Sequence, residues 1–468
     1  MGADAVKYRE KIVSGPILKT VLWLSLPLII VQLIQVSYNV ADAFWLSMYS
    51  DIALAVPRQT WPLLLFFSAI STALSSSNLA LISQYVGAKK FERASDVASK
   101  FLTVSVASGL IFSCIFLALR HIIFSDLIRV PPEIYGQVVD FAGVVSVVMA
   151  FSYIVTAYST ILQALGDTKS PAIINAFYLV ANIAMDPLFI FGIGPFPELG
   201  AVGAAVTDLI GNVFSVVTLA LLVKRKLPDL HIRLTSNVNL DWVALNLKIG
   251  LPVLVLIFSN SVAKMFQLRL INAFGVVAAT AYSFSFIAID LSEAILRGVA
   301  RGTAIMVGQN LGAGLSERAR ETAIKTSLLL FAVTLVGAFL VYAYMDAFIG
   351  VFIQDPAIYA KARKLLEILI WSLPFFGVLL VALFVGRGSG HTVPPTLMGI
   401  ARLWGFHVGL GYLLAFYLGY GSIGIWTAMA VGNLVTGLAA LAWMKYGDWA
   451  RPIIRMRKRG MRMPPSPD

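Results

Sequence analysis

The chain has 468 residues, of which 59% are hydrophobic and only 13% are charged, and its mean hydropathy is +0.83. A water-soluble domain needs about a quarter of its residues charged to cover its surface, so this composition excludes a soluble globular protein and indicates a membrane protein. The net charge of +12 does not require nucleic acid as a partner, because the Lys and Arg residues lie where anionic lipid headgroups would meet them.

Apolar segments long enough to cross a bilayer, about 20 residues each, recur along the whole chain, and no strand-like alternation competes with them. We therefore predict an all-α polytopic membrane protein with twelve transmembrane helices. The first six cover residues 17–45, 53–85, 93–121, 133–165, 170–193 and 199–223. The last six cover residues 242–272, 276–311, 318–343, 357–386, 393–418 and 422–445.

Lys and Arg residues gather in alternate loops, and this asymmetry predicts the orientation of the chain. The basic segments are the two terminal tails and the second, central and eighth loops, with Lys7, Lys90, Arg225 and Arg318 among their residues. Both termini are therefore predicted to be cytoplasmic, in a multi-pass protein of the cell membrane. The segment 355–364 carries positive charge on the opposite side, and we interpret it as an amphipathic stretch at the outer surface.

The chain contains two copies of one six-helix unit. Residues 84–94 and 309–319 share the element Gln-x-x-Gly-Ala at an offset of 225 residues, and the same offset joins Pro27 to Pro252. Units with an even number of helices keep the same orientation, so we predict parallel repeats that rock about a central cavity in alternating access. The predicted parts are an N-lobe 1–223, a cytoplasmic linker 224–240, a C-lobe 241–447 and a basic cytoplasmic tail 448–468.

Three carboxylates distinguish the two copies. Asp42, Asp186 and Asp208 of the first copy correspond to uncharged residues of the second. Each acid lies on a polar stripe with helical spacing, and a polar stripe in a membrane helix turns away from lipid. The other members of these stripes, which we predict to line a polar cavity of the N-lobe, are Gln35, Asn39, Asn175, Tyr178, Asn182 and Asn212.

These acids have no Lys or Arg deep in the N-lobe spans to neutralise them. Three ionised carboxylates in a low-dielectric pocket cannot all stay unpaired, so we predict that the group is protonated or holds a cation. Oxygen ligands, with the Thr207 hydroxyl nearby, suit Na⁺ or H⁺ and not a transition metal. The alternative is that the acids are hydrogen-bonded packing residues. We favour an ion site for Asp42 and Asp186 and leave both interpretations open for Asp208.

The second copy carries charges of both signs. We interpret them as a polar network in which acids and bases compensate one another, in preference to an ion site. Arg402 and His407, in the eleventh predicted helix, fit either interpretation. The residues of the candidate C-lobe network are Lys264, Gln267, Asp290, Glu293, Arg297 and Arg301.

Pro27 lies inside the first predicted helix, on the N-terminal side of Asp42. A proline inside a helix removes a backbone hydrogen bond and permits a bend. A movable hinge at Pro27 would shift the part of the helix that bears Asp42, whereas a static kink would not. The sequence leaves both interpretations open.

Several of these elements occur together in one known family. Leu26-Pro27, the doubled Gln-x-x-Gly-Ala element, the segment 164–167 and Asp186-Pro187 resemble the multidrug and toxic compound extrusion (MATE) transporters, most closely their DinF-like branch. The resemblance covers about residues 10–445. It implies a V-shaped bundle of two pseudo-symmetric six-helix lobes, which exports organic and often cationic compounds in exchange for Na⁺ or H⁺.

The resemblance also implies roles for single residues. It makes Asp42, Asn182 and Asp186 the cation site and Pro27 a bending proline. The family has a hydroxyl residue where this chain has Asp208, with Thr207 beside it, and this departure leaves the role of the extra acid open.

Two alternatives compete with an ion-driven exporter. A lipid-linked sugar flippase of the same superfamily would have more cationic residues along its central cavity, whereas the acidic N-lobe favours cationic cargo. A membrane-embedded enzyme would need a metal-ligand set, a nucleophile–base pair or a phosphate-binding loop, and the sequence contains none of these motifs. We therefore predict no catalytic residue and no cofactor besides the coupling ion. We expect a monomer whose partners are small organic molecules and membrane lipids.

Overall fold

The computed structural model describes residues 3–50, 52–53, 55–226 and 230–454, with their side chains except those of 3–4, 287–288 and 290–291. The regular elements within these residues are all helices. The first half contains α1 (Ala3–Ser14), α2 (Ile17–Tyr49), α3 (Ala55–Gly87), α4 (Phe91–Ile122), η1 (Ile123–Leu127), α5 (Pro132–Ala164), α6 (Lys169–Phe191) and α7 (Ala201–Lys226). The second half contains α8 (Leu240–Asn272), α9 (Gly275–Gly312), α10 (Ser316–Ala343), α11 (Met345–Phe352), α12 (Pro356–Leu369), η2 (Ile370–Ser372), α13 (Leu373–Ser389), α14 (Val393–Ile400), η3 (Ala401–Leu410), η4 (Leu413–Tyr417) and α15 (Gly421–Tyr446).

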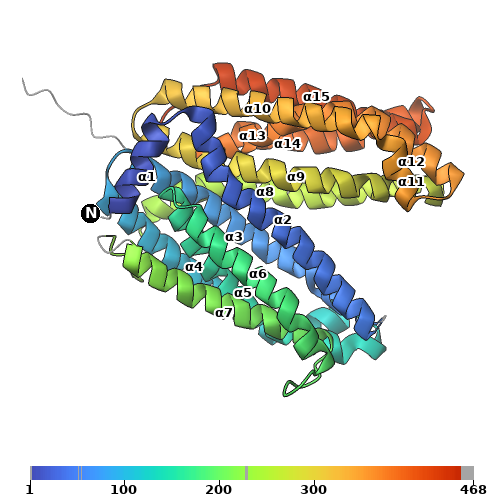
Figure 1. Ribbon diagram of the computed structural model, residues 1–468, viewed down its shortest axis with the longest axis horizontal. Helices are drawn as coiled ribbons and strands as arrows, with labels where there is room; N and C mark the ends of the chain where they lie inside the picture. The colour runs from blue at the N-terminus through green and yellow to red at the C-terminus, as the bar shows by residue number, and fades with distance from the viewer. Residues whose placement is uncertain (1–2, 51, 54, 227–229, 455–468) are drawn as a thin grey trace, which may run out of the picture.

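The long helices form two arms of a V (Figure 1). Helices α2 to α7 form the N-lobe and α8 to α15 form the C-lobe; the two meet at the end where α1 lies and separate toward the opposite end. The first long helix of each lobe also packs against the other lobe, because α2 contacts α9 and α8 contacts α3. The predicted all-α, V-shaped membrane bundle is therefore confirmed.

Eleven helical segments of the described chain are long and apolar enough to cross a membrane. The remaining predicted span corresponds to α9, a single helix of 38 residues. Its described apolar stretch is Gly275–Phe286, and Glu293, Arg297 and Arg301 follow further along the same helix. Helix α9 contacts α2, α3, α10 and α13, so its charged part lies within the bundle, where charges in membrane helices are tolerated.

Buried apolar side chains join the two lobes at the meeting end. One continuous cluster there draws on both lobes and includes Val86 and Leu311, which are both 0% exposed. Toward the open end the lobes have separate clusters, around Phe124 in the N-lobe and around Trp426 in the C-lobe. A shared core at one end and separate cores at the other produce the V shape.

The repeated Gln-x-x-Gly-Ala element closes the meeting end with two equivalent contacts. Gln84 Nε2 of α3 donates to the carbonyl oxygens of Gly388 and Ser389, at 3.3 and 3.0 Å, where α13 ends. Gln309 Nε2 of α9 donates to the carbonyl oxygen of Ala164, at 2.9 Å, where α5 ends. Each glutamine therefore crosses from its own lobe to the other, and the sequence repeat becomes a pair of matching contacts in space.

Both ends of the described chain pack against this closure. Arg9 of α1 donates two hydrogen bonds, of 2.9 and 2.6 Å, to the carbonyl oxygen of Gly87. At the other end, the backbone N–H of Ile453 donates to Gln84 Oε1 at 2.9 Å. The first residues of the predicted basic tail, 448–454, therefore belong to the closed end, and the rest of the tail lies outside the described residues.

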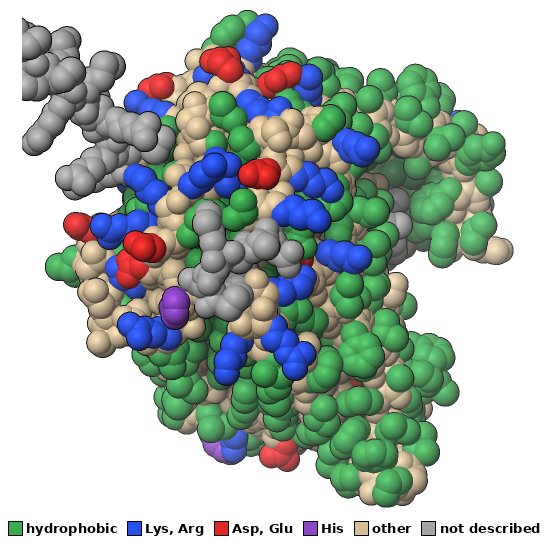
Figure 2. Space-filling model, turned by 60° about the vertical axis from the view of Figure 1, so that its left-hand side comes forward, with side chains coloured by type: hydrophobic (Ala, Val, Ile, Leu, Met, Phe, Trp, Pro, Cys, Tyr) green, Lys and Arg blue, Asp and Glu red, His purple; other side chains and the backbone are tan. Residues whose placement is uncertain are grey.

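Lys and Arg side chains cover the meeting end. Figure 2 shows them gathered on the face turned toward the viewer, with mainly apolar side chains on the arms beyond and a hollow between the arms. The alternate loops that are rich in Lys and Arg thus lie at the same end of the molecule.

The basic segment 355–364 forms the N-terminal end of α12, where every side chain except that of Ala362 is partly or fully exposed. It begins a span that the structure continues without a break over Pro356–Ser389. Its positive charge is partly compensated, because Arg363 pairs with Asp346 at 2.9 Å. Hydrogen bonds from Tyr359 and Arg363 lower the pKa of Asp346, which keeps this acid ionised as their partner.

The segment between the lobes is shorter than the predicted linker. Helix α7 continues to Lys226 and α8 begins at Leu240, while residues 227–229 lie outside the described chain. The backbone N–H of Thr235 donates to Thr103 Oγ1 of α4 at 2.9 Å. The last part of the linker therefore packs along α4.

Candidate cation site and central cavity

Asp208 is the centre of a hydrogen-bond cluster inside the N-lobe. It lies in α7, and its Oδ1 accepts hydrogen bonds from the Tyr38 hydroxyl of α2 at 3.1 Å and the Tyr178 hydroxyl of α6 at 2.8 Å. Asn182 Nδ2, one turn after Tyr178 on α6, donates to the same oxygen at 2.7 Å. Three helices thus converge on one carboxylate oxygen, so the polar stripes of α6 and α7 face each other.

Asp186 forms the second part of the cluster. Its Oδ1 accepts a hydrogen bond from Thr207 Oγ1 at 2.5 Å, and both side chains are fully buried. Asp186 Oδ2 and Asn182 Oδ1 are also buried and accept no hydrogen bond from the described residues. A buried acceptor without a donor is costly, and a bound proton or a small cation would satisfy these oxygens.

Asp42 lies beside these groups without joining their hydrogen bonds. It is half-buried in α2, its Oδ1 accepts no hydrogen bond from the described chain, and it lies within electrostatic range of Asp186 and Asp208. No three acidic, His or Cys side chains among the described residues are arranged to hold a metal ion. The three acids are therefore neighbours: Asp208 and Asp186 each have their own hydrogen-bond donors, and Asp42 lies beside them without one at its Oδ1.

The other predicted residues of the N-lobe cavity separate into three groups. Asn212 belongs to the acid cluster, because its Nδ2 donates to the Tyr178 hydroxyl at 3.2 Å. Gln35 donates to Asn39 at 3.2 Å on a more exposed part of α2, and neither has a described hydrogen bond to the acids. Asn175 lines the central cavity instead.

The sequence does not single out two contributors to the cluster. Tyr38 is only 8% exposed and lies four residues before Asp42, so helical spacing from that acid would have placed it on the same face. Ser152 of α5 donates to Asn212 Oδ1 at 3.1 Å. Nothing in the apolar sequence of α5 marks this serine.

Gly211 makes room for the Tyr178 ring. A Cβ at this position would overlap that ring and would lie 3.1 Å from Asn182 Oδ1. We expect Gly211→Ala to displace Tyr178 from Asp208 and to lower the melting temperature, because overpacking a core costs about 1–3 kcal/mol. Thermal unfolding in detergent measures the change. The matched control is Gly405→Ala, where a Cβ meets nothing within 4 Å, and equal melting temperatures of the two variants would contradict the expectation.

Two adjoining cavities lie between the lobes, separate from the acid cluster. Their volumes are about 320 and 370 Å³, and they share Thr72 of α3, Arg297 of α9, and Phe384 and Arg387 of α13. The first extends to Asn175 in the N-lobe, and the second extends into the C-lobe. None of the three N-lobe acids lines either of these cavities.

The predicted C-lobe network is compensated only in part. Glu293 and Arg297 form an ion pair of 2.5 Å, one turn apart in α9. Gln267 Nε2 donates to Met429 Sδ at 2.8 Å, and Lys264 lines the second cavity. The side chain of Asp290 lies outside the described residues.

One contact of the acid cluster has a counterpart in the C-lobe, where an arginine replaces the tyrosine. In the N-lobe, Asn212 donates to Tyr178 at 3.2 Å; at the equivalent positions of the C-lobe, Arg402 Nη1 donates to Asn433 Oδ1 at 3.1 Å. His407 lies one turn further along the same π-helical segment as Arg402 and is buried, and its Nε2 has no hydrogen-bond partner among the described residues. The two lobes therefore share this interhelical contact, with a guanidinium in one and a phenol in the other.

The same two-part organisation appears when the chain is compared with known proteins. The MatE family model matches residues 27–188 and 249–413, one segment in each lobe. The chain belongs to the MATE transporter family. The Bacillus subtilis protein described as probable multidrug resistance protein YoeA is 26% identical to it, over 93% of this chain and 97% of its own length.

Two solved structures show the same fold. A crystal structure of MATE in the bent conformation superimposes with a TM-score of 0.84 and 22% identity, over 95% of this MATE chain and 97% of that chain. A MOP superfamily transporter from Pyrococcus furiosus, for which the reverse polarity of the binding pocket suggests a different function, has a TM-score of 0.82 and 21% identity over 93% of this chain and 96% of its own. Because MATE proteins are transporters, the prediction of a non-enzymatic membrane transporter is confirmed.

Proposed function

We propose that this MATE protein is a secondary active exporter in which H⁺ or Na⁺ binding in the N-lobe drives the export of small organic compounds. The observation that carries this proposal is the buried acid cluster, in which Asp186 and Asn182 each have an oxygen without a donor. The Bacillus subtilis relative, described as a probable multidrug resistance protein, supports small organic cargo. The resemblance to the DinF-like branch supports an N-lobe coupling site and favours cargo that is often cationic.

The proposed orientation places the basic meeting end and both termini in the cytoplasm of a monomer in the cell membrane. Positive loops of membrane proteins stay on the cytoplasmic side, and the Lys and Arg residues of this chain gather at that end (Figure 2). In this orientation the V opens to the outside. In this proposal the coupling ion enters the acid cluster from the external side, in exchange for exported cargo.

The hydrogen-bond cluster connects the acids to α2, which contacts both lobes. Tyr38 of α2 donates to Asp208 at 3.1 Å, so neutralisation of the acids changes what holds α2 in the N-lobe. On the other side of this helix, Ser25 Oγ donates to the Val299 carbonyl oxygen of α9 at 3.3 Å. Pro27 lies between these two attachments. A bend there lets one part of α2 move while the other keeps its contact with the C-lobe, which is the proposed coupling step.

Proton coupling is expected to be stronger than sodium coupling. Na⁺ is bound by several oxygens that converge on one point, whereas the described acids form no group arranged to hold a metal ion. We expect an imposed pH gradient to drive dye movement in proteoliposomes faster than an equal Na⁺ gradient. Ethidium, a cation, and riboflavin 5′-phosphate, an anion, are followed with the two gradients varied independently. If neither gradient moves either dye, the exporter proposal is wrong.

A lipid-linked sugar flippase is the second candidate, and one observation favours it. The central cavities are lined by Arg297, Arg301 and Arg387, and cationic cavity residues are what a pyrophosphate-linked sugar would require. Lipid-linked sugar that copurifies with the protein, without gradient-driven movement of either dye, would support the flippase over the exporter.

A further inference from the structure

The central cavities carry an excess of positive charge. Five Lys and Arg side chains line them against one described acid, Glu293. The basic residues come from four elements of the C-lobe and are Lys264 of α8, Arg297 and Arg301 of α9, Arg387 of α13 and Arg402 of η3.

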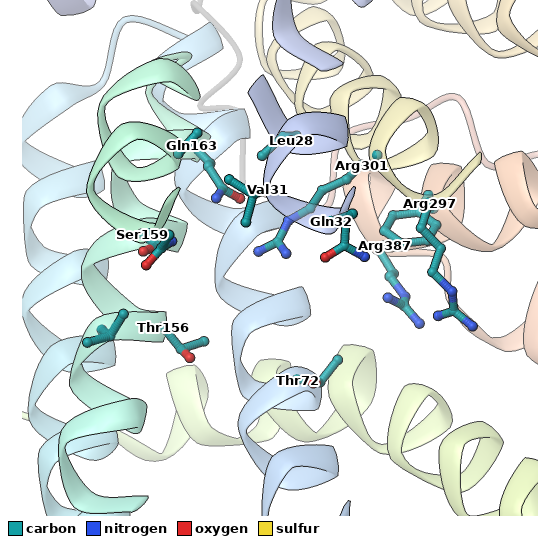
Figure 3. Close-up of a pocket in the computed structure, with 15 residues that line it drawn as sticks. Leu28, Val31, Gln32, Thr72, Thr156, Ser159, Gln163, Arg297, Arg301 and Arg387 are labelled. Carbon is teal, nitrogen blue, oxygen red and sulfur yellow. The ribbon is translucent and has the colours of Figure 1, made fainter. Parts of the chain in front are cut away.

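Two of these guanidinium groups, those of Arg297 and Arg387, belong to both cavities, and that of Arg301 lines the first cavity. Figure 3 shows those of Arg297 and Arg387 side by side, while Arg301 reaches toward Val31 and Gln32 of α2. Arg387 is within electrostatic range of both other arginines. Like charges this close repel one another in a medium of low dielectric, so the cluster requires a neutralising partner.

The described protein supplies little negative charge to neutralise these guanidinium groups. Arg297 is paired with Glu293 at 2.5 Å. Arg301 and Arg387 form no hydrogen bond or ion pair within the described chain, and the one attractive contact of Arg387 is with the Phe384 ring, 4.5 Å from its Cζ. A guanidinium has five N–H donors in a planar fork that matches a phosphate or carboxylate. The donors of these two arginines are therefore available to a ligand.

The rest of the lining suits an apolar or aromatic body. Phe384 borders both cavities, and Leu256, Phe286 and Phe376 line the second. The Arg402 Cζ lies 4.6 Å from the centre of the Phe376 ring, so polar and aromatic surfaces alternate. The two volumes, about 320 and 370 Å³, are each of the size that accommodates a small organic ligand.

We propose that the central cavities bind an organic anion, an aromatic or apolar molecule whose phosphate or carboxylate group is held by Arg301 and Arg387. As a statement about cargo, this inference rests on the proposed exporter function; as a statement about binding, it stands on the cavity alone. Anion and coupling ion then occupy different lobes. The repeat supports this division, because the offset of 225 residues pairs Thr72 of the N-lobe with Arg297 of the C-lobe.

Two dyes that differ by one phosphate provide the test. Riboflavin 5′-phosphate and riboflavin share a fluorescent ring, so their binding to the purified protein in detergent, without any gradient, isolates the contribution of the anionic group. We expect the phosphate form to bind at least about tenfold more tightly, as one charge-assisted hydrogen bond requires. Arg301→Gln and Arg387→Gln should each remove this preference and leave riboflavin binding unchanged. Lys325→Gln, at an exposed ion pair of α10, is the matched control.

The melting temperatures of the Arg301 and Arg387 variants distinguish a ligand-binding role of these arginines from a structural role. If the arginines serve the ligand, removing one unpaired positive charge should preserve or raise the melting temperature of the ligand-free protein while affinity falls. Equal affinities of the wild-type protein for the two dyes, no binding of either at millimolar concentration, or a preference that survives both Arg variants would overturn the proposal. Gradient-driven export can fail while this binding persists, so failure of the exporter proposal is distinguishable.

A lipid headgroup would supply the same chemistry. Dioctanoyl phosphatidylglycerol, added to the binding assay beside dioctanoyl phosphatidylcholine, identifies the source. Displacement of riboflavin 5′-phosphate by the anionic lipid alone, lost in Arg387→Gln, supports the arginine site and assigns it to a lipid. Retention of the dye with both lipids supports the site and assigns it to a water-soluble anion.

Discussion

Replacement of Asp186 by Asn is expected to reduce gradient-driven export by about tenfold or more. Asp186 is fully buried, its Oδ1 is held by Thr207, and its Oδ2 accepts no hydrogen bond from the described chain. An Asn side chain keeps an oxygen for Thr207 but can neither take up a proton nor carry a negative charge. The variant therefore removes ion binding with little change in packing. The measurement is the initial rate of dye movement in proteoliposomes under an imposed pH gradient.

The same loss is expected for Asp42→Asn, because this carboxylate lies within electrostatic range of Asp186 and has a buried oxygen without a donor. Glu133→Gln is the matched control, since Glu133 is an exposed acid in the first turn of α5. Binding of riboflavin 5′-phosphate should persist in both Asp variants, as neither residue lines the central cavities. Export at the wild-type rate in both variants would place the coupling site elsewhere.

The fold could be predicted from the sequence because the bilayer leaves the backbone few options. A spanning segment must satisfy its own hydrogen bonds, so apolar runs of sufficient length are helices. The segment 355–364 shows where the pattern is insufficient. Its positive charges depart from the loop-charge rule, and the structure pairs one of them, Arg363, with Asp346 earlier in the chain at 2.9 Å. A charge pair between separate helices cannot be recognised from loop counts.

The candidate cation site was found by comparing the two six-helix copies of the chain. The same comparison also distinguishes basic residues of the C-lobe. It distinguished Asp186 as an acid without a counterpart, and the structure places this residue in a buried cluster. Applied to basic residues, an offset of 224 pairs Gln163 with Arg387, and both line the first cavity. Composition cannot predict the rotation of each helix. The sequence therefore did not indicate that Tyr38 belongs to the cluster. It also did not indicate that the three acids lie beside one another without converging on one point.

A large effect is also expected from adding a side chain to either glycine that closes the meeting end of the two lobes. Gly87 of α3 and Gly312 of α9 are the glycines of the repeated Gln-x-x-Gly-Ala element. A Cβ on Gly87 would overlap the Gln309 carbonyl, with the Gln309 Cα at 2.9 Å, and a Cβ on Gly312 would overlap the Gln84 carbonyl, with the Gln84 Cα at 2.7 Å. Both contacts involve backbone atoms of the opposite lobe, which no side-chain rotation can move away.

Gly87→Ala is therefore expected to force the lobes apart at the closed end. The overlap costs about 1–3 kcal/mol, which shifts an equilibrium between closed and open arrangements by about 5- to 150-fold. A Ser83→Cys reporter, in a Cys114→Ser background, measures the shift, because Ser83 is fully buried and faces Gly308 of the other lobe. Labelling by a membrane-impermeant maleimide, applied from the basic side, should accelerate by a similar factor.

The symmetry of the two Gln-x-x-Gly-Ala elements extends the expected acceleration of labelling to a second variant. Because the two glutamines and the two glycines form matching contacts across the closure, Gly312→Ala should accelerate labelling of the same reporter as Gly87→Ala does. Gly337→Ala, in α10, should leave labelling unchanged, since a Cβ there meets nothing within 4 Å. Acceleration by Gly87→Ala alone would mean that the two contacts open independently. Equal acceleration by both glycine variants would mean that the repeated element acts as one gate, which opens when either half is displaced.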